Sequence, residues 1–208
     1  MKTTLNVPNQ ITLSRLALAI VFFVLLAHYS QRDEPLKTWL LDLTVVLFIV
    51  AASTDFLDGS LARKWGQVTS LGRVLDPLVD KVLICGTFVL FAGPGFVDGS
   101  GNNVTEVQPW MVVVIVGREL LVTGLRGFNE SIGRPFAATV YGKLKMWMQS
   151  IAAPAILFII ARENQGHFAA WALWVKGTLA WLTVIVTALS TIQYLIRSRH
   201  ILEESGTA

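Results

Sequence analysis

Six apolar segments, each close to the length of a membrane-crossing helix, make up most of this chain. A helix needs roughly 20 apolar residues to cross a bilayer. Of the 208 residues, 53% are hydrophobic and 15% are charged, and the mean hydropathy is +0.58. Soluble domains carry about 25% charged residues. The composition therefore argues against a water-soluble globule and predicts a polytopic, all-α membrane protein.

The expected architecture is a single transmembrane domain over residues 1–208 with six helical spans. The gaps between the apolar segments are short and either polar or rich in Gly and Pro, which leaves no room for a second, soluble domain. The spans are expected at about 10–29, 37–58, 74–93, 109–126, 146–162 and 169–196.

The basic residues predict the orientation of these spans. Of the 17 Lys and Arg residues, four (Arg32, Lys37, Arg162 and Lys176) fall on one side of the predicted membrane and the other 13 on the opposite side. Lys and Arg are enriched in cytoplasmic loops. Both termini and the even-numbered connections are therefore expected in the cytoplasm.

Cysteine content and net charge exclude three further classes of protein. Cys85 is the single cysteine, so the chain has no internal disulfide framework and no multi-cysteine metal site. The net charge of +3 suits an anionic lipid surface and is too small to indicate a nucleic-acid partner.

Four Asp residues lie close together in the sequence, at the cytoplasmic ends of the second and third spans. Asp55 and Asp58 are one helical turn apart, as are Asp76 and Asp80, so each pair lies on one helix face. The short connection makes the two helices antiparallel neighbours. One such Asp could be a helix cap or a solvated charge, but ionisable groups beside spans are costly, and four at these spacings favour a common site.

Four neighbouring carboxylates need compensating positive charge. Ligand sets made only of oxygen favour the hard cations Mg²⁺, Mn²⁺ or Ca²⁺ over zinc. A pair of such ions stabilises both the attacking and the leaving oxygen in a displacement at phosphorus. The carboxylates therefore indicate divalent metal binding and phosphoryl-type chemistry.

Small residues accompany the carboxylates. Gly59, Ala62 and Gly72 lack bulk where the two helices would face each other, so a planar ring or a diphosphate could approach the backbone closely. Ordinary small-residue helix packing is the alternative. Arg63 could pair with a phosphate in a bidentate manner or serve as an interfacial anchor.

The whole pattern reads Asp55-x2-Asp58-Gly59-x2-Ala62-Arg63-x8-Gly72-x3-Asp76-x3-Asp80. In all eight fixed residues it resembles the signature of the CDP-alcohol phosphotransferases. The resemblance implies an integral membrane enzyme of six spans, usually a homodimer, that transfers a phosphatidyl or related group from a CDP-alcohol to an acceptor hydroxyl and releases CMP.

The resemblance also implies roles for individual residues. Asp55, Asp58, Asp76 and Asp80 would hold two divalent ions, Mg²⁺ or Mn²⁺, and Asp80 would take the proton from the acceptor. The residues expected to line the site of the CDP-lipid are Gly59, Ala62, Arg63 and Gly72.

Segments outside this motif bear on the acceptor. Asn9, Thr12 and Arg15, at the start of the first span, resemble the corresponding pocket residues of family members whose acceptor is glycerol 3-phosphate, as do the segments from Gly117 to Arg126 and from Gly142 to Gln149. The expected substrates are therefore CDP-diacylglycerol and glycerol 3-phosphate.

Charge supports an anionic acceptor. Arg118 and Arg126 are about two helical turns apart on one face, and Lys143 and Lys145 lie just across the fourth connection, so several cations could surround one phosphate. The alternative is that these residues follow the cytoplasmic enrichment of basic residues and bind membrane lipid headgroups.

Two alternative functions stay open at this point. One is a synthase of the same family with another acceptor, either phosphatidylglycerol, which would give cardiolipin, or inositol phosphate. The other is a cation or proton transporter, because clustered Asp residues within a membrane also mark ion paths. The chain has little sequence beyond the six expected spans, which fits a protein of a bacterial inner membrane, and its site is expected to face the cytoplasm.

Overall fold

The computed structural model describes residues 7–33, 37–65, 70–131, 133, 139–166 and 171–205; within its helices, the side chains of 7–12, 55–65, 70–77 and 199–205 lie outside the description. The described residues form six α-helices and one short 3₁₀ helix, with no extended strand. The helices are α1 (Val7–Ala27), α2 (Thr38–Trp65), α3 (Ser70–Phe91), α4 (Pro109–Ser131), α5 (Val140–Asn164) and α6 (Trp171–Ser205), with η1 (Pro94–Phe96) between α3 and α4.

Local sequence explains several helix ends. Thr139 caps α5, because its hydroxyl accepts the backbone N–H of Gly142 at 3.1 Å. Pro109 occupies the first position of α4, where a missing N–H costs nothing. Gly166, just beyond α5, has φ = +74°, a left-handed conformation that glycine adopts without strain and that ends the helix.

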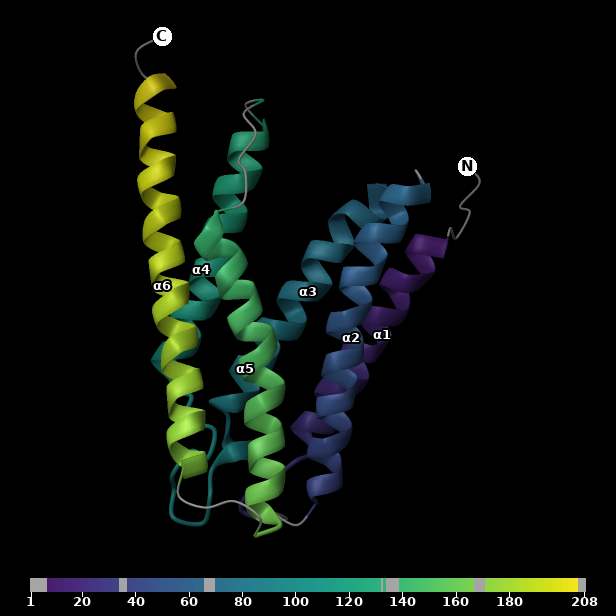
Figure 1. Cartoon of the computed structure of the whole chain (residues 1–208), viewed down its shortest axis with the longest axis vertical. Helices are drawn as coiled ribbons and strands as arrows, with labels where there is room; N and C mark the ends of the chain where they lie inside the picture. Colours follow the sequence, from purple (N-terminus) through teal and green to yellow (C-terminus); the bar gives the residue numbers. More distant parts are fainter. Residues whose placement is uncertain are drawn as a thin grey trace.

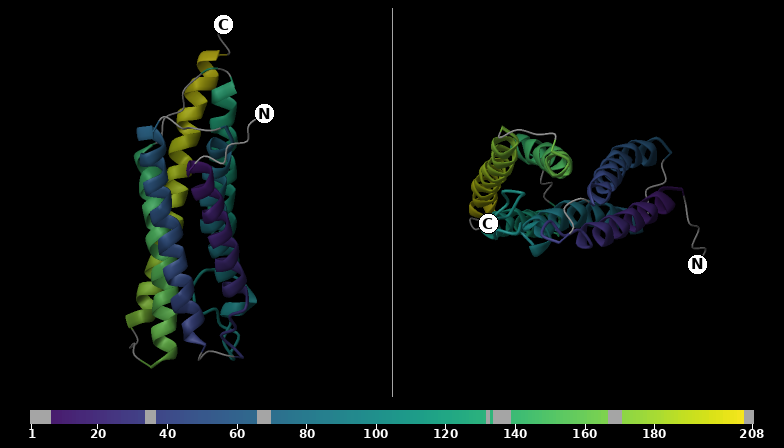
Figure 2. Two further views of the ribbon diagram at one scale, coloured as in Figure 1. Left: turned by 90° about the vertical axis from the view of Figure 1, so that its right-hand side faces the viewer. Right: turned by 90° about the horizontal axis from the view of Figure 1, so that it is seen from below.

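The helices pack as two groups that lean away from each other. α1, α2 and α3 contact one another, and α6 packs against both α4 and α5. Figure 1 shows the two groups close together at the lower end of the bundle and diverging toward the upper end, where the described part of α1 begins and that of α6 ends. The right-hand view in Figure 2 shows the two groups end on.

The lower half of the bundle contains the apolar core and a polar network that ties its end together. Phe22, Phe48, Phe88 and Ile156 are among the fully buried core side chains. Below the core, the connections between helices are held by side-chain bonds: Asn164 donates to Oη of Tyr29 (2.7 Å), and the Arg162 guanidinium pairs with Asp42 (2.6 Å) and the Lys176 ammonium with Glu163 (2.5 Å).

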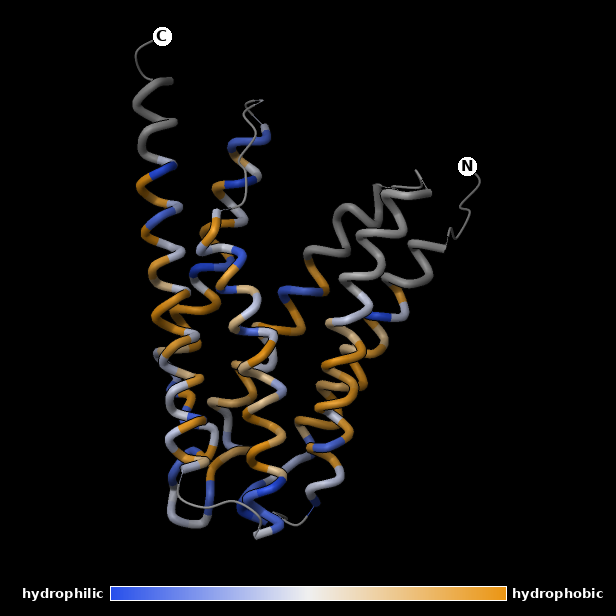
Figure 3. The backbone as a smooth tube through the Cα atoms, in the orientation of Figure 1, coloured by the Kyte–Doolittle hydropathy of each residue, from blue (hydrophilic) through white to orange (hydrophobic). Residues whose placement is uncertain are grey.

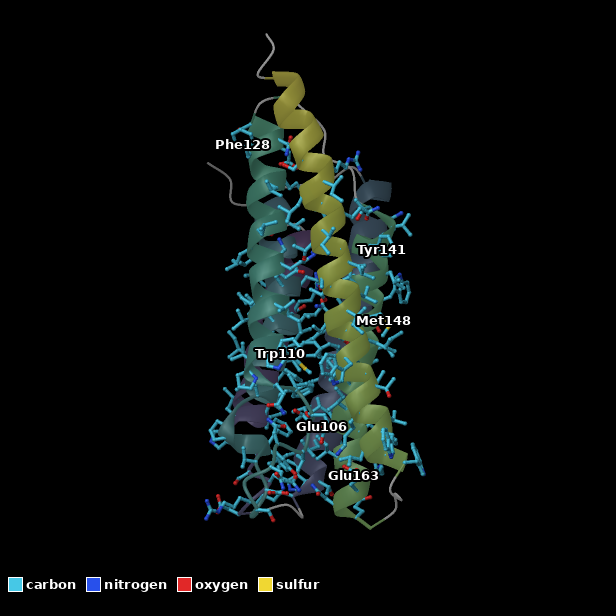
Figure 4. All side chains as sticks on the ribbon, turned by 90° about the vertical axis from the view of Figure 1, so that its left-hand side faces the viewer. Glu106, Trp110, Phe128, Tyr141, Met148 and Glu163 are labelled. Carbon is cyan, nitrogen blue, oxygen red and sulfur yellow. The ribbon has the colours of Figure 1, made fainter. Side chains whose placement is uncertain are left out.

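The outer surface carries large apolar side chains along much of its length. Val113 and Leu120 on α4 are 71% and 70% exposed, and Trp174 on α6 is 78% exposed. Figure 3 shows apolar residues along the middle of the helices and polar ones at the lower turns, and Figure 4 shows Trp110 and Phe128 toward opposite ends of α4. Soluble monomers rarely expose so much contiguous apolar surface.

The expected all-α class is confirmed. By length and composition, two helices of the described residues could cross a membrane, Val140–Asn164 and Trp171–Ser198, and shorter apolar stretches lie at Leu13–Ala27 and Thr38–Thr54. All six expected spans overlap a helix, but their bounds differ. α2 and α6 continue past residues 58 and 196, and α3 and α5 begin before residues 74 and 146, because helices continue through polar sequence that hydropathy does not count as membrane-crossing.

Candidate active site

A cavity of about 650 Å³ lies between α3, α4, α5 and α6. Its charged lining consists of five basic and three acidic residues, a net charge of +2. These residues are Lys81, Arg118, Arg126, Lys143, Lys145, Asp80, Glu119 and Glu130. The cavity therefore favours an anionic ligand.

The structure brings together five of the residues singled out in the sequence. Asp80 lies on the α3 wall of the cavity, and all four basic residues expected at the acceptor site, Arg118, Arg126, Lys143 and Lys145, lie on the α4 and α5 walls. What they bind stays a prediction.

Arg15 and Asp80 form an ion pair between α1 and α3. Nη2 of Arg15 lies 3.5 Å from Oδ1 of Asp80, and the Arg15 side chain is 1% exposed. Arg15 was expected in the pocket from the sequence; here it contacts the carboxylate expected to act as the base, and it is not among the residues lining the cavity.

The other expected site residues cannot be placed by side chain. Asn9 and Thr12 belong to α1, and the remaining motif residues belong to α2 and α3, but their side chains lie outside the described residues. They are Asp55, Asp58, Gly59, Ala62, Arg63, Gly72 and Asp76. The described residues contain no group of three or more possible metal-ligating side chains.

Glu119 holds two cations of the inner cavity wall. Its carboxylate accepts from Nη1 of Arg118 at 2.9 Å and from Nζ of Lys145, which reaches it from α5. All three residues are at most 7% exposed. Buried charges need partners, so this triad keeps both basic side chains in place within the wall of the cavity.

α6 completes the environment of Arg118. Nη2 of Arg118 donates to the Ser190 hydroxyl at 2.8 Å, and the guanidinium carbon lies 5.3 Å from the centre of the Tyr194 ring. The Tyr194 hydroxyl in turn accepts the backbone N–H of Thr139 at 3.2 Å. Tyr194 thus links the Arg118 side chain to the start of α5, and three helices meet around this arginine.

α3 contributes one further cation. Nζ of Lys81 donates to Oγ1 of Thr123 on α4 at 2.5 Å, and the Thr123 hydroxyl donates to the carbonyl oxygen of Glu119 at 2.6 Å. Asp80 and Lys81 therefore extend from neighbouring positions of α3 toward different helices, α1 and α4.

Comparison with known proteins decides the family. The family described as CDP-alcohol phosphatidyltransferase matches residues 5–191, which include every residue of the Asp motif and, of the residues that line the cavity, all except Tyr194. The chain belongs to the CDP-alcohol phosphatidyltransferase family. This assignment agrees with the resemblance seen in the Asp motif and argues against the transporter alternative.

Relatives match over nearly their full length. The chain is 34% identical to a CDP-diacylglycerol–glycerol-3-phosphate 3-phosphatidyltransferase of Bacillus subtilis, covering 97% of this chain and 99% of the relative. Proteins with the same name from Pectobacterium atrosepticum and Rickettsia prowazekii are 33% and 30% identical, with 96% and 93% of this chain covered, and 98% and 96% of the relatives.

The sequence analysis gave no role in the site to five residues that the structure places there: Lys81, Glu119, Thr123, Ser190 and Tyr194. A signal for the last two exists in α6, where Thr183, Thr187, Ser190 and Tyr194 recur at intervals of four, three and four residues. That spacing places them along one face of an apolar helix, and polar residues in such helices are often functional. Lys81 directly follows the last Asp of the motif.

Proposed function

We propose that this protein transfers the phosphatidyl group of CDP-diacylglycerol to glycerol 3-phosphate, giving phosphatidylglycerophosphate and CMP. The observation that carries this proposal is the cavity, where Asp80 and the basic side chains of α4 and α5 line one space. A phosphate monoester has a charge of about −1.5 to −2 at neutral pH, which complements the net charge of the lining. The names of the relatives supply the donor and the acceptor.

The chemistry is a direct displacement at phosphorus. The phosphate of glycerol 3-phosphate binds the basic wall, and its primary hydroxyl points toward Asp80. Asp80 accepts the hydroxyl proton while the oxygen attacks the phosphorus that bears diacylglycerol. The bond from that phosphorus to the CMP oxygen breaks, and CMP leaves. Positioning and charge neutralisation supply most of the rate in such reactions, so no covalent intermediate on the protein is needed.

We further propose that Asp55, Asp58, Asp76 and Asp80 hold two divalent cations, Mg²⁺ or Mn²⁺. The donor set fits hard cations, since it offers carboxylate oxygens and no His or Cys. When bound, these ions neutralise the charge of the donor's diphosphate. The contact between α2 and α3, the helices that carry the four Asp residues, supports this proposal.

The proposed setting is a bacterial inner membrane crossed by all six helices, with the cavity and both termini on the cytoplasmic side and two copies of the chain forming a homodimer. The exposed apolar side chains on α4, α5 and α6 support membrane embedding. The basic cavity lies at the end of the bundle where the sequence places most Lys and Arg residues.

The deciding experiment offers the purified protein radiolabelled CDP-diacylglycerol and Mg²⁺ with one acceptor at a time: glycerol 3-phosphate, inositol phosphate, serine or phosphatidylglycerol. CMP release with glycerol 3-phosphate alone is expected. Release with another acceptor instead would assign a different synthase of the family, and no release with any would refute the proposal.

Two further measurements in the same assay test the proposed base and the proposed metal ions. Asp80→Asn should abolish CMP release while the protein still binds CDP-diacylglycerol, whereas Asp33→Asn, an exposed Asp at the lower end of the bundle, should leave turnover unchanged. EDTA should stop turnover, and Mg²⁺ or Mn²⁺ should restore it. Turnover that persists in chelator would contradict the metal assignment.

A further inference from the structure

The α3 wall of the cavity places a cation directly beside the proposed base. Lys81 follows Asp80 in α3, and both residues line the cavity. Consecutive residues of a helix are separated by about 100° around its axis. The Asp80 carboxylate accordingly meets Arg15 on α1, while the Lys81 ammonium meets Thr123 on α4. Lys81 therefore places a positive charge next to the proposed base and in contact with α4, which carries part of the basic wall.

Thr123 holds this ammonium without neutralising it. The hydroxyl hydrogen of Thr123 is directed to the carbonyl oxygen of Glu119, so its oxygen is free to accept from Lys81. An ammonium has three donors, and Thr123 accepts from one of them. The side chain of Lys81 is half-buried, which leaves part of it accessible from the cavity.

The charge of Lys81 differs in this respect from those of the inner wall. Arg118 and Lys145 share the carboxylate of Glu119. Among the ion pairs formed between described residues, none includes Lys81. A phosphate entering the cavity would therefore find at Lys81 a positive charge that no carboxylate of the described residues compensates.

We infer that Lys81 binds the phosphate of the acceptor while the acceptor's hydroxyl lies at Asp80. In glycerol 3-phosphate three carbons separate the reacting hydroxyl from the phosphate, so a molecule held at both groups spans neighbouring side chains of α3. Lys81 thereby selects a phosphorylated alcohol over a neutral one. The inference rests on the proposed function and assigns acceptor selection to α3 in addition to α4 and α5.

The test compares Lys81→Met, which keeps the length of the side chain and removes its charge, with Lys81→Arg, which keeps the charge. In detergent micelles containing CDP-diacylglycerol and Mg²⁺, Lys81→Met should raise the KM for glycerol 3-phosphate by about ten-fold or more, as expected for loss of a charge-assisted hydrogen bond. The KM for CDP-diacylglycerol should stay within two-fold, and Lys81→Arg should recover most of the loss. Lys37→Met, an exposed lysine at the lower end of the bundle, is the matched control and should behave as wild type.

Three results would overturn the inference: an unchanged KM for glycerol 3-phosphate in Lys81→Met, an equal rise in both KM values, or failure of Lys81→Arg to recover any of the loss.

If Lys81→Met turns over too slowly for its KM values to be measured, binding is measured instead, as the rise in Tm that glycerol 3-phosphate alone causes. That rise should be present in wild type and Lys81→Arg and absent in Lys81→Met, and its persistence in Lys81→Met would also overturn the inference. Failure of wild type to use glycerol 3-phosphate would refute the proposed function, whereas wild-type transfer with an unaffected Lys81→Met refutes only this inference.

Discussion

Glu119 is the residue on which both innermost cations of the cavity depend. Removing one partner of a buried ion pair leaves an uncompensated charge and typically costs about 3–5 kcal/mol. Glu119→Gln keeps the shape of the side chain and loses its charge, so Arg118 and Lys145 would face each other without a counter-ion. We expect a free energy of unfolding lower by about 3 kcal/mol, measured by thermal unfolding in detergent.

A double-mutant cycle checks the cause of that loss. Glu119→Gln combined with Lys145→Met removes one of the two stranded cations together with the carboxylate. The double variant should be less destabilised than the sum of the two single variants, since residues in direct contact couple. Strict additivity would show that Glu119 and Lys145 do not interact in the folded protein.

Tyr194 has contacts through its ring and contacts through its hydroxyl, and two substitutions distinguish them. Tyr194→Phe keeps the ring beside Arg118 and removes the hydroxyl, which accepts the Thr139 N–H and also bonds to the Arg126 side chain; it should lower stability by about 1 kcal/mol, and any change in the KM for glycerol 3-phosphate in this variant reports the hydroxyl contacts alone. Tyr194→Leu also removes the ring, and a cation–π contact of about 1 kcal/mol predicts a KM for glycerol 3-phosphate roughly five-fold higher than that of Tyr194→Phe. Equal KM values for the two variants would show that the ring does not position Arg118.

The start of α5 lies close against α6, and Gly142 permits this approach. A Cβ at Gly142 would lie 3.0 Å from Oη of Tyr194 and 3.2 Å from Oγ1 of Thr139. Gly142→Ala should therefore lower both the Tm and the activity, because either Tyr194 or the cap of α5 must move. Gly177→Ala in α6 is the matched control: nothing lies within 4 Å of its Cβ, so the substitution should be neutral or stabilising by up to about 1 kcal/mol. Equal effects of the two variants would contradict the packing argument.

Helix positions were predictable from hydropathy, and helix lengths were not. Apolar runs locate the part of each helix that faces lipid or core, which is why every expected span overlaps a helix. The polar ends of α2, α3, α5 and α6 continue as helix because backbone hydrogen bonds and capping maintain them beyond the apolar part. The start of α5, which carries Lys143 and Lys145, is such an extension, so these two residues, which we propose for the acceptor site, lie on a helix where a loop was expected.

The sequence predicted cavity residues that lie on one helix or on consecutive helices, but it did not predict contacts between helices distant in sequence. Periodicity places Arg118 and Arg126 on one face of α4 and indicates Lys143 and Lys145 across a short connection, which are relations within a helix or between consecutive helices. It does not reveal that α6 packs against α4, so the contacts of Ser190 and Tyr194 with Arg118 could not be derived. Pairing of helices distant in sequence depends on tertiary packing.

The two ends of the bundle differ: a polar network ties the helices together at one end, and the basic cavity lies toward the other. At the lower end, ion pairs and hydrogen bonds join α1, α2, α5 and α6 through Tyr29, Asp42, Glu163 and their partners. Toward the upper end the two helix groups diverge (Figure 1), and α3 to α6 enclose the basic cavity. The cavity lies toward one end of the bundle, so the orientation of the bundle in the membrane decides which compartment is nearer to it and would supply a water-soluble acceptor.

Cysteine labelling in intact cells tests that orientation. Cys85 is the single cysteine, so Cys85→Ala provides a background without thiols. In that background Ser100→Cys lies in the exposed connection between η1 and α4, and Ser131→Cys lies at the exposed end of α4, on the side of the cavity. Because Lys and Arg accumulate on the cytoplasmic side, a membrane-impermeant maleimide should label Ser100→Cys in intact cells and Ser131→Cys only after permeabilisation. The reverse pattern would place the cavity outside the cytoplasm, where CDP-diacylglycerol and glycerol 3-phosphate would have to be supplied from the other face of the membrane.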